Sequence, residues 1–306
     1  MKGYNITKQM LMQRRLLLAA PFLAVIPRAH AQAPLAVTAS FSILADMTRQ
    51  IGGARVSVSA IVGPDVDSHG FQARPSDASA LRDAALVVRN GIGFEPWLDR
   101  LLGASRPRGL VVTASEGIAP RTIAGARRAP DPHGWQDLGR AATYVANIET
   151  GLIAADPSGA GAYREGASAY RARLAALDAW VRGEIATVPE ARRKIITSHD
   201  ALGYFAEAYG VTFLAPQRMA AHGEPSAAAL GALIRQARAE RISAIFLENA
   251  GSPAILERLA REAGMAVRGR LYADALSAAS GPAATYEAMF RHNVTLMVPA
   301  MRGNAG

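Results

Sequence analysis

The hydrophobic pattern of this chain is most regular between Asp156 and Val188. Apolar side chains recur there at steps of three and four, which is typical of an amphipathic helix; they are Tyr163, Ala167, Tyr170, Leu174, Leu177, Val181 and Ile185. Asp156 suits the N-cap and Pro157 the first helical position. A helix of this length extends for roughly 48 Å, more than one small domain needs. The pattern favours a rod that joins two lobes; a long helix packed inside one domain is the alternative.

Strand-like and helix-like segments alternate on both sides of this rod, which favours parallel sheets. The predicted fold is therefore α/β, with an N-terminal lobe over residues 32–155, a connecting helix over 156–189 and a C-terminal lobe over 190–306. The predicted strands are 35–40, 56–62, 86–89, 110–113, 194–198, 211–215, 243–247 and 266–268. The predicted helices are 43–52, 76–85, 95–102, 137–155, 201–209, 225–239, 252–263 and 284–301, and residues 114–134 are predicted to be loop.

Residues 1–31 have the pattern of a secretory signal peptide. Arg14 and Arg15 precede an apolar run from Leu16 to Ile26, and Ala29-His30-Ala31 is a small-x-small cleavage site. The apolar run is too short to span a bilayer as a stable helix. We expect cleavage after Ala31 and export to the periplasm, by either the general or the twin-arginine route.

Composition excludes several kinds of function. The chain has no cysteine, so it has no disulfide, thiolate ligand, cysteine nucleophile or cysteine-linked lipid anchor. Five of the 34 basic residues and no acidic residue lie in the first 31 positions, so the net charge falls from +9 to +4 without them. That mild charge, without a basic run that interleaves with aromatic residues, does not indicate nucleic-acid binding.

Three histidines follow predicted strands. His69, His133 and His199 each lie in a loop that leads toward a helix, and ligands bind at such loops in open parallel sheets. Imidazole is the commonest neutral metal donor, and a closed tetrahedral site needs a fourth ligand; Asp274, after the last predicted strand, is the candidate. Each histidine taken singly is an ordinary loop or capping residue, and it is their equivalent placement across two lobes that suggests a metal site.

Other polar residues are expected to have supporting roles. The acids beside the histidines are expected to cap helices or orient imidazoles; they are Asp65, Asp67, Asp131 and Asp200. His222 lies in a loop and is either a lid residue or an ordinary solvent-exposed one. His292 lies within the last predicted helix and is expected to be structural.

The chain resembles the solute-binding receptors of zinc and manganese ABC importers, the cluster A-I or cluster 9 family. The resemblance rests on DSHGFQARPSD, DPHGWQD, SHDALGYFAEAYGV, GEPSAAALGALIRQARAERISAIFLEN and LYADALSAASGPAATYEAMFRHNV, which follow the family's order and cover nearly all of the mature chain. It implies two α/β lobes, a rigid connecting helix and one metal in the cleft, held by His69, His133, His199 and Asp274. It also implies an inner-membrane permease with a cytoplasmic ATPase as partners, and we expect a monomer.

Two departures from the family pattern bear on affinity. Thr122 to Pro130 is short and basic, whereas many zinc receptors carry a long His- and Asp-rich loop before the second ligand. In the first motif, Ser68 replaces the usual proline and Gln72 the usual acidic residue.

Three imidazoles and one carboxylate suit Zn²⁺, with manganese or iron as alternatives. The resemblance also implies that manganese-preferring members tend to carry a carboxylate at the position of His199, which favours zinc here. One rival interpretation is a secreted zinc hydrolase, which needs an open coordination position and a general base; Glu248 and Asp200 are candidates, although a supporting role suits them better, and no HExxH motif is present. Another is a receptor for an organic solute, or an adhesin. We predict a receptor without enzymatic activity that captures zinc and delivers it to a permease.

Overall fold

The computed structural model describes residues 33–123, 129–197, 199–215, 227–240, 242, 244–249, 257–258, 260–262 and 264–303. The predicted signal peptide, His222 and most of the predicted helix 252–263 lie outside these residues. The chain from Pro34 onward forms one compact unit. Within the described ranges, no helix is both long enough and apolar enough to cross a membrane.

The first lobe is built on a four-stranded parallel sheet in the order β2-β1-β3-β4. Its central strands β1 and β3 carry buried Val37, Ala39, Leu86 and Val88, which pack against the covering helices. The strands are β1 (Leu35–Phe41), β2 (Val56–Val62), β3 (Leu86–Arg89) and β4 (Leu110–Thr113). The helices are α1 (Ser42–Gly52), α2 (Pro75–Asp83), α3 (Pro96–Ser105) and α4 (Leu138–Ala155).

The second lobe repeats this topology. Its four-stranded parallel sheet has the order β10-β9-β7-β8, so in each lobe the first strand lies between the second and the third. The strands are β7 (Lys194–Ile196), β8 (Thr212–Leu214), β9 (Ala244–Glu248) and β10 (Ala266–Leu271), and the helices are α6 (Gly203–Tyr209), α7 (Ala227–Ala239) and α9 (Tyr286–Met301). Where the chain continues in opposite directions after two adjacent parallel strands, a crevice opens at the carboxyl ends of those strands. The predicted class, two α/β lobes with parallel sheets, is confirmed.

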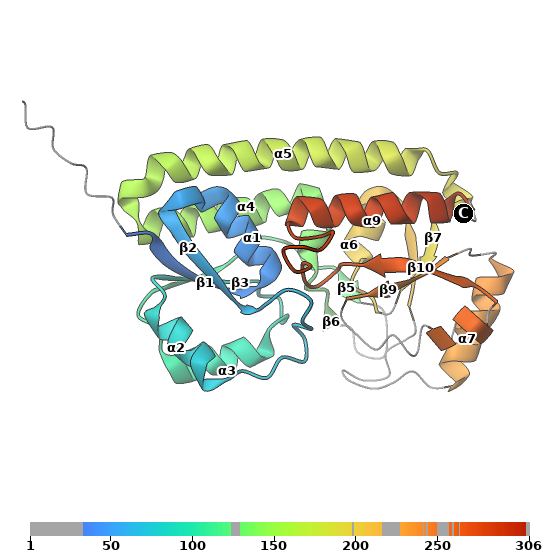
Figure 1. Ribbon diagram of the computed structural model, residues 1–306, viewed down its shortest axis with the longest axis horizontal. Helices are drawn as coiled ribbons and strands as arrows, with labels where there is room; N and C mark the ends of the chain where they lie inside the picture. The colour runs from blue at the N-terminus through green and yellow to red at the C-terminus, as the bar shows by residue number, and fades with distance from the viewer. Residues whose placement is uncertain are drawn as a thin grey trace, which may run out of the picture. The chain divides into compact units, whose positions relative to one another are not determined.

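The long helix α5 (Ala160–Ala186) is the predicted connection between the lobes. Its 27 residues extend for about 40 Å, and Figure 1 shows it alongside α1, α4 and α9, which it contacts. The seven apolar residues that define the pattern are all buried. Gly166 lets α1 approach closely, because a Cβ there would lie 2.2 Å from the carbonyl oxygen of Ile51.

The helix α3 ends three residues later than predicted, and α5 begins at Ala160 instead of Pro157. Two further differences concern the predicted loop 114–134 and β10. The predicted loop 114–134 contains a two-stranded antiparallel ribbon and a short 3₁₀ turn: β5 (Thr122–Ile123), β6 (Ala129–Pro130) and η2 (Gly134–Gln136). β10 runs three residues further than predicted, to Leu271. Its pairing shifts register between Val267 and Arg270, around Gly269 with a φ of 147°, and this irregularity breaks the alternation by which a strand is recognised.

Asp156 fixes the beginning of the connecting helix. A 3₁₀ turn, η3 (Pro157–Gly159), precedes α5, and the Asp156 carboxylate accepts a hydrogen bond from the backbone N–H of Gly159. It also accepts bonds from Ser158 (2.5 Å), Arg55 (2.8 Å) and Tyr163 (2.8 Å). The hydrogen bonds from Ser158 and Arg55 hold the pKa of Asp156 well below its usual range. The carboxylate therefore ties α5 to the turn after α1.

We expect Asp156→Ala to lower the melting temperature, because loss of an N-cap alone costs about 1 kcal/mol. The carboxylate of Asp156 contributes fully to the stability of the fold above its pKa in the unfolded chain, which is about 3.9. This contribution is lost as the pH falls through the lower pKa that Asp156 has in the folded protein. Thermal unfolding followed by circular dichroism measures the change. Asp83→Ala, at an exposed acid in α2, is the control; equal losses in the two variants would contradict this role of Asp156.

Candidate metal centre

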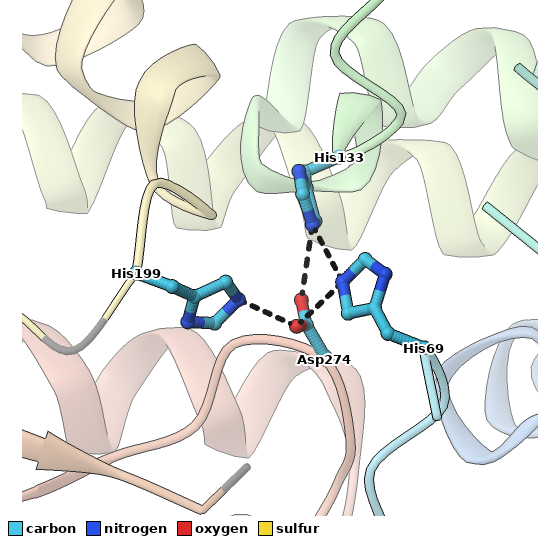
Figure 2. A group of neighbouring side chains, drawn as sticks. All are labelled: His69, His133, His199 and Asp274. Atoms are coloured by element: carbon cyan, nitrogen blue, oxygen red, sulfur yellow. Dashed lines mark hydrogen bonds and ion pairs between the residues drawn. The ribbon is translucent and has the colours of Figure 1, made fainter. Parts of the chain in front are cut away.

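Four side chains from four separate loops meet at one point, as Figure 2 shows. His69 lies between β2 and α2, His133 directly before η2, His199 after β7 and Asp274 after β10. Each therefore comes from the region beyond the carboxyl end of a strand or from the ribbon that follows β4. One donor atom from each residue lies within 4.8 Å of the others. The structure thus brings together all four of the residues selected from the sequence.

Four of the distances within this cluster are close to those of a tetrahedral site. Asp274 Oδ2 lies 2.8 Å from His199 Nε2 and 3.2 Å from His69 Nε2. His133 Nε2 lies 3.3 Å from His69 Nε2 and 3.5 Å from Asp274 Oδ1. Metal–ligand bonds of about 2.0–2.1 Å in a tetrahedron place neighbouring ligand atoms about 3.3 Å apart. The four distances lie on either side of this value, and all the donor atoms lie within 4.8 Å of one another.

Two buried carboxylates orient the histidines from behind. Asp131 Oδ1 lies 2.7 Å from His133 Nδ1 and also accepts the His133 backbone N–H. Glu248 Oε2 lies 2.5 Å from His199 Nδ1. A carboxylate at Nδ1 leaves the Nε2 lone pair facing the cluster and raises the basicity of the imidazole. Both residues belong to the acids for which the sequence suggested a supporting role.

The buried charges act strongly on each other. Burial alone would lower the pKa of His199, but the negative charges of Glu248 and Asp274 outweigh it and raise this pKa well above its ordinary value. Burial would likewise raise the pKa of Asp274, but His199 and His133 outweigh it and hold this pKa well below its ordinary value. The two carboxylates therefore favour the protonated form of His199.

An aromatic wall closes one side of the cluster. The ring of Phe94 stands edge-on to His69 with 4.8 Å between ring centroids, and it contacts Trp135 at the same distance. The turn before Phe94 contains Ile92 with a φ of 51°. Buried Glu95 fixes this turn by accepting hydrogen bonds from Ser40 Oγ (2.8 Å) and the Gly91 backbone N–H (3.1 Å). Sequence reasoning missed Phe94 and Glu95, which lie in a short segment without a histidine and outside the motifs that hold the four site residues.

Access to the cluster is from the His69 side. The His69 side chain is 22% exposed, whereas those of His133, His199 and Asp274 are between 0% and 7% exposed. The loop that carries His69 is held by Asp67, whose carboxylate accepts the His69 backbone N–H at 2.8 Å. A ligand ion therefore meets one partly exposed imidazole in front of three buried donors.

The remaining sequence candidates lie apart from the cluster. Asp65 accepts a hydrogen bond from the Ala278 backbone N–H, and Asp200 is exposed. His292 lies on α9 with its Nε2 2.9 Å from the Arg270 carbonyl oxygen, as expected for a structural residue.

Comparisons with known proteins agree with this architecture. Residues 37–300 match the profile of the family described as zinc-uptake complex component A, periplasmic. The manganese-binding lipoprotein MntA of Halalkalibacterium halodurans is 32% identical over 87% of this chain and 88% of its own length. The iron-binding protein YfeA of Yersinia pestis is 30% identical over 84% of this chain and 83% of its own. The periplasmic zinc-binding protein TroA of Treponema pallidum has a TM-score of 0.81 at 30% identity, over 88% of this chain and 99% of that one.

The chain belongs to this family, the solute-binding proteins of metal ABC importers. It is an extracytoplasmic metal-binding receptor that works with a membrane permease and its ATPase, and the resemblance predicted from the motifs is confirmed. The predicted absence of enzymatic activity is confirmed as well, because members of the family are transport receptors. The rival interpretation as a zinc hydrolase is thereby excluded.

The electrostatics of the metal-free site can be tested directly. We expect Glu248→Gln to lower the pKa of His199, because it removes one of the two charges that stabilise the imidazolium. NMR titration of the histidine ring resonances, with His292 as the internal reference, measures the change. Because the pKa of His199 is higher in the folded protein than in the unfolded chain, its proton stabilises the metal-free fold. This stabilisation is complete below the unfolded pKa of about 6.5 and is lost as the pH rises through the folded pKa. An unchanged titration of His199 in the variant would contradict the assigned contact.

Proposed function

We propose that the transported ion is zinc and that His69, His133, His199 and Asp274 are its four ligands. The observation that carries the proposal is the convergence of three imidazoles and one carboxylate within 4.8 Å. Zinc accepts such a set in a tetrahedral site, whereas manganese favours more oxygen donors and a higher coordination number. The buried carboxylates behind His133 and His199 support the same role, because metal-bound histidines usually donate their second N–H to such a group.

Manganese and iron are the second candidates. Relatives of comparable similarity are named for manganese, iron and zinc, so family membership alone does not select among them. The position of His199 favours zinc, since an imidazole there leaves Asp274 as the one carboxylate of the set.

The proposal includes the organisation of the exported protein. Residues 1–31 act as a signal peptide, and the mature periplasmic receptor begins at Gln32 and works as a monomer. The relatives named as lipoproteins differ from this chain, which contains no cysteine to carry a lipid. Residues 32–155 and 190–306 act as the two lobes and residues 156–189 as their connection. N-terminal sequencing of the exported protein tests the cleavage, and its elution volume on gel filtration tests the oligomeric state.

We expect alanine substitution of any one of the four ligands to weaken zinc binding by about one to three orders of magnitude. Each order of magnitude corresponds to about 1.4 kcal/mol of binding free energy. Calorimetric titration of the metal-free variants measures the effect. His292→Ala is the matched control, because this histidine contacts a carbonyl oxygen on another element. Unchanged zinc affinity in the His133 or His199 variant would refute the site.

We expect the unmodified protein to bind zinc more tightly than manganese. His199→Glu should reduce this difference in affinity, because it should weaken zinc binding more than manganese binding. The test uses His199→Glu together with Glu248→Gln, because Glu248 lies 2.5 Å from His199 and would repel a second carboxylate. Competition titrations of zinc against manganese compare the two proteins. Manganese binding as tight as zinc binding by the unmodified protein would overturn the assignment of zinc.

Zinc affinity should also depend on pH. The metal must displace the proton of His199, whose pKa is raised in the metal-free protein, so affinity falls as the pH falls. The fall begins above the ordinary histidine value of about 6.5. Titrations at about pH 7.5 and about pH 5.5 check the direction, and equal affinities at the two values would contradict it.

A further inference from the structure

Asp274 follows a strand of the second sheet, but the first lobe holds its backbone. The carbonyl oxygen of the preceding residue, Ala273, accepts two hydrogen bonds: from Trp135 Nε1 at 2.9 Å and from Gln136 Nε2 at 2.7 Å. Both donors are on η2, directly after His133, and both side chains are buried. A carbonyl oxygen with two buried donors has both lone pairs engaged, so the peptide before Asp274 is fixed to the turn that carries His133.

The chain after Asp274 is held in the same way. Leu276 donates its N–H to Ser42 Oγ (3.0 Å) and accepts the Asp65 N–H at its carbonyl oxygen (2.9 Å). The N–H of Ala278 donates to the Asp65 carboxylate (3.0 Å). Among the described residues, five hydrogen bonds connect the segment from Ala273 to Ala278 to the first lobe. On the side of the second lobe, Asn249 Nδ2 donates to the Ala275 carbonyl oxygen and the Ser277 N–H to the Ala283 carbonyl oxygen. Asn293 of α9 binds both backbone groups of Tyr272, just before the segment.

His199 has different supports. Its Nδ1 and its backbone N–H both face Glu248, the last residue of β9, and its carbonyl oxygen accepts from Thr197 Oγ1, directly after β7. Its Nε2 faces Asp274 Oδ2, and its ring lies edge-on to those of His69 and His133 with 6.0 Å between centroids. The helix that follows, α6, meets the first lobe at Tyr204, whose hydroxyl donates to the Asp131 carbonyl oxygen. His199 therefore lies at the end of the second sheet, between β7 and this anchored helix.

We propose that His69, His133 and Asp274 form a three-ligand platform fixed to the first lobe, and that His199 is the exchangeable fourth ligand, carried by the second sheet. Gln136 is then a positioning residue: it acts on the metal through Asp274. This inference rests on the proposed ligand set. An arriving ion is first held by the platform, to which the partly exposed His69 gives access, and the site closes when the ends of β7 and β9 bring His199 onto it. Release reverses the step, with His199 leaving first.

A double-mutant cycle with Zn²⁺ tests the role of Gln136. Gln136→Met keeps the length of the side chain and removes the donor, and we expect it to weaken zinc affinity by about 10- to 100-fold, the usual effect of losing an outer partner of a ligand. If Gln136 acts through Asp274, the substitution adds no further loss in an Asp274→Ala background, whereas in a His199→Ala background it adds its full effect. Gln236→Met, at an exposed position on α7, is the matched control.

Trp135→Phe is the second variant, because it removes the other donor to Ala273 and keeps most of the ring; it should show the same dependence on Asp274. An equal loss in the Asp274→Ala and His199→Ala backgrounds would overturn the platform, as would unchanged affinity of both single variants.

The order of release has its own readout. The rate at which a chelator removes Zn²⁺ should rise in His199→Ala, while His199→Ala retains more affinity than His69→Ala, His133→Ala or Asp274→Ala. If these four variants all bind zinc as tightly as the unmodified protein, the proposed ligand set itself fails, an outcome distinct from a failure of the cycle.

Discussion

A carboxylate without exposed surface is stable as an anion only where cations or hydrogen-bond donors surround it. Asp274 is such a carboxylate, and the arrangement of the site follows from the need to neutralise it. Three imidazoles face its oxygens, and a proton on His199 or a divalent ion can supply the positive charge. Asp131 forms its own ion pair with Arg121 at 2.6 Å. It can therefore orient His133 without adding negative charge that the groups around Asp274 would have to neutralise.

The fold meets this need by repeating one topology twice. In both sheets the first strand lies between the second and the third, so the carboxyl ends of β1 and β7 each begin a crevice. The long α5 contacts α1 and α4 of the first lobe and α6 and α9 of the second, which limits how far the two halves can separate. A site whose ligands come from four loops needs such a frame, since moving one loop by about an ångström would change a metal–ligand distance of about 2 Å by half.

Patterns that are local in the sequence predicted most of the fold. The buried face of α5 is a property of a short stretch and is found as expected. Asp156 caps the 3₁₀ turn η3 that precedes α5, whereas the N-cap of α5 itself is Gly159. The four site residues were selected because each follows a strand and fits a motif. The interruption of β10 at Gly269 and the ribbon β5–β6 were missed, because they depend on pairing with another strand.

The contacts that hold the ligands were less visible in the sequence. Asp131 stands two residues before His133, and that spacing suggested its role. Gln136 and Ala273 are separated by 137 positions, and a main-chain carbonyl has no sequence signature at all. The position of Phe94 beside His69 was not visible in the sequence either, because it depends on a turn fixed by Glu95.

Selectivity among divalent ions depends both on the donor atoms and on the geometry of the frame that holds them. Intrinsic affinity for nitrogen and oxygen donors rises from manganese through iron toward copper and remains high at zinc, so a flexible set of three imidazoles and one carboxylate would hold zinc in preference to manganese without further help. A receptor for manganese has to oppose that order by adding oxygen donors or by keeping the ligands too far apart to close on a smaller ion. Here the donor atoms already approach to 2.8–3.5 Å along the contacts of Asp274 and His133. Asp131 and Glu248 lie directly behind His133 and His199, and Gln136 binds the backbone before Asp274, so the separations that an arriving ion meets are set by contacts outside the cluster.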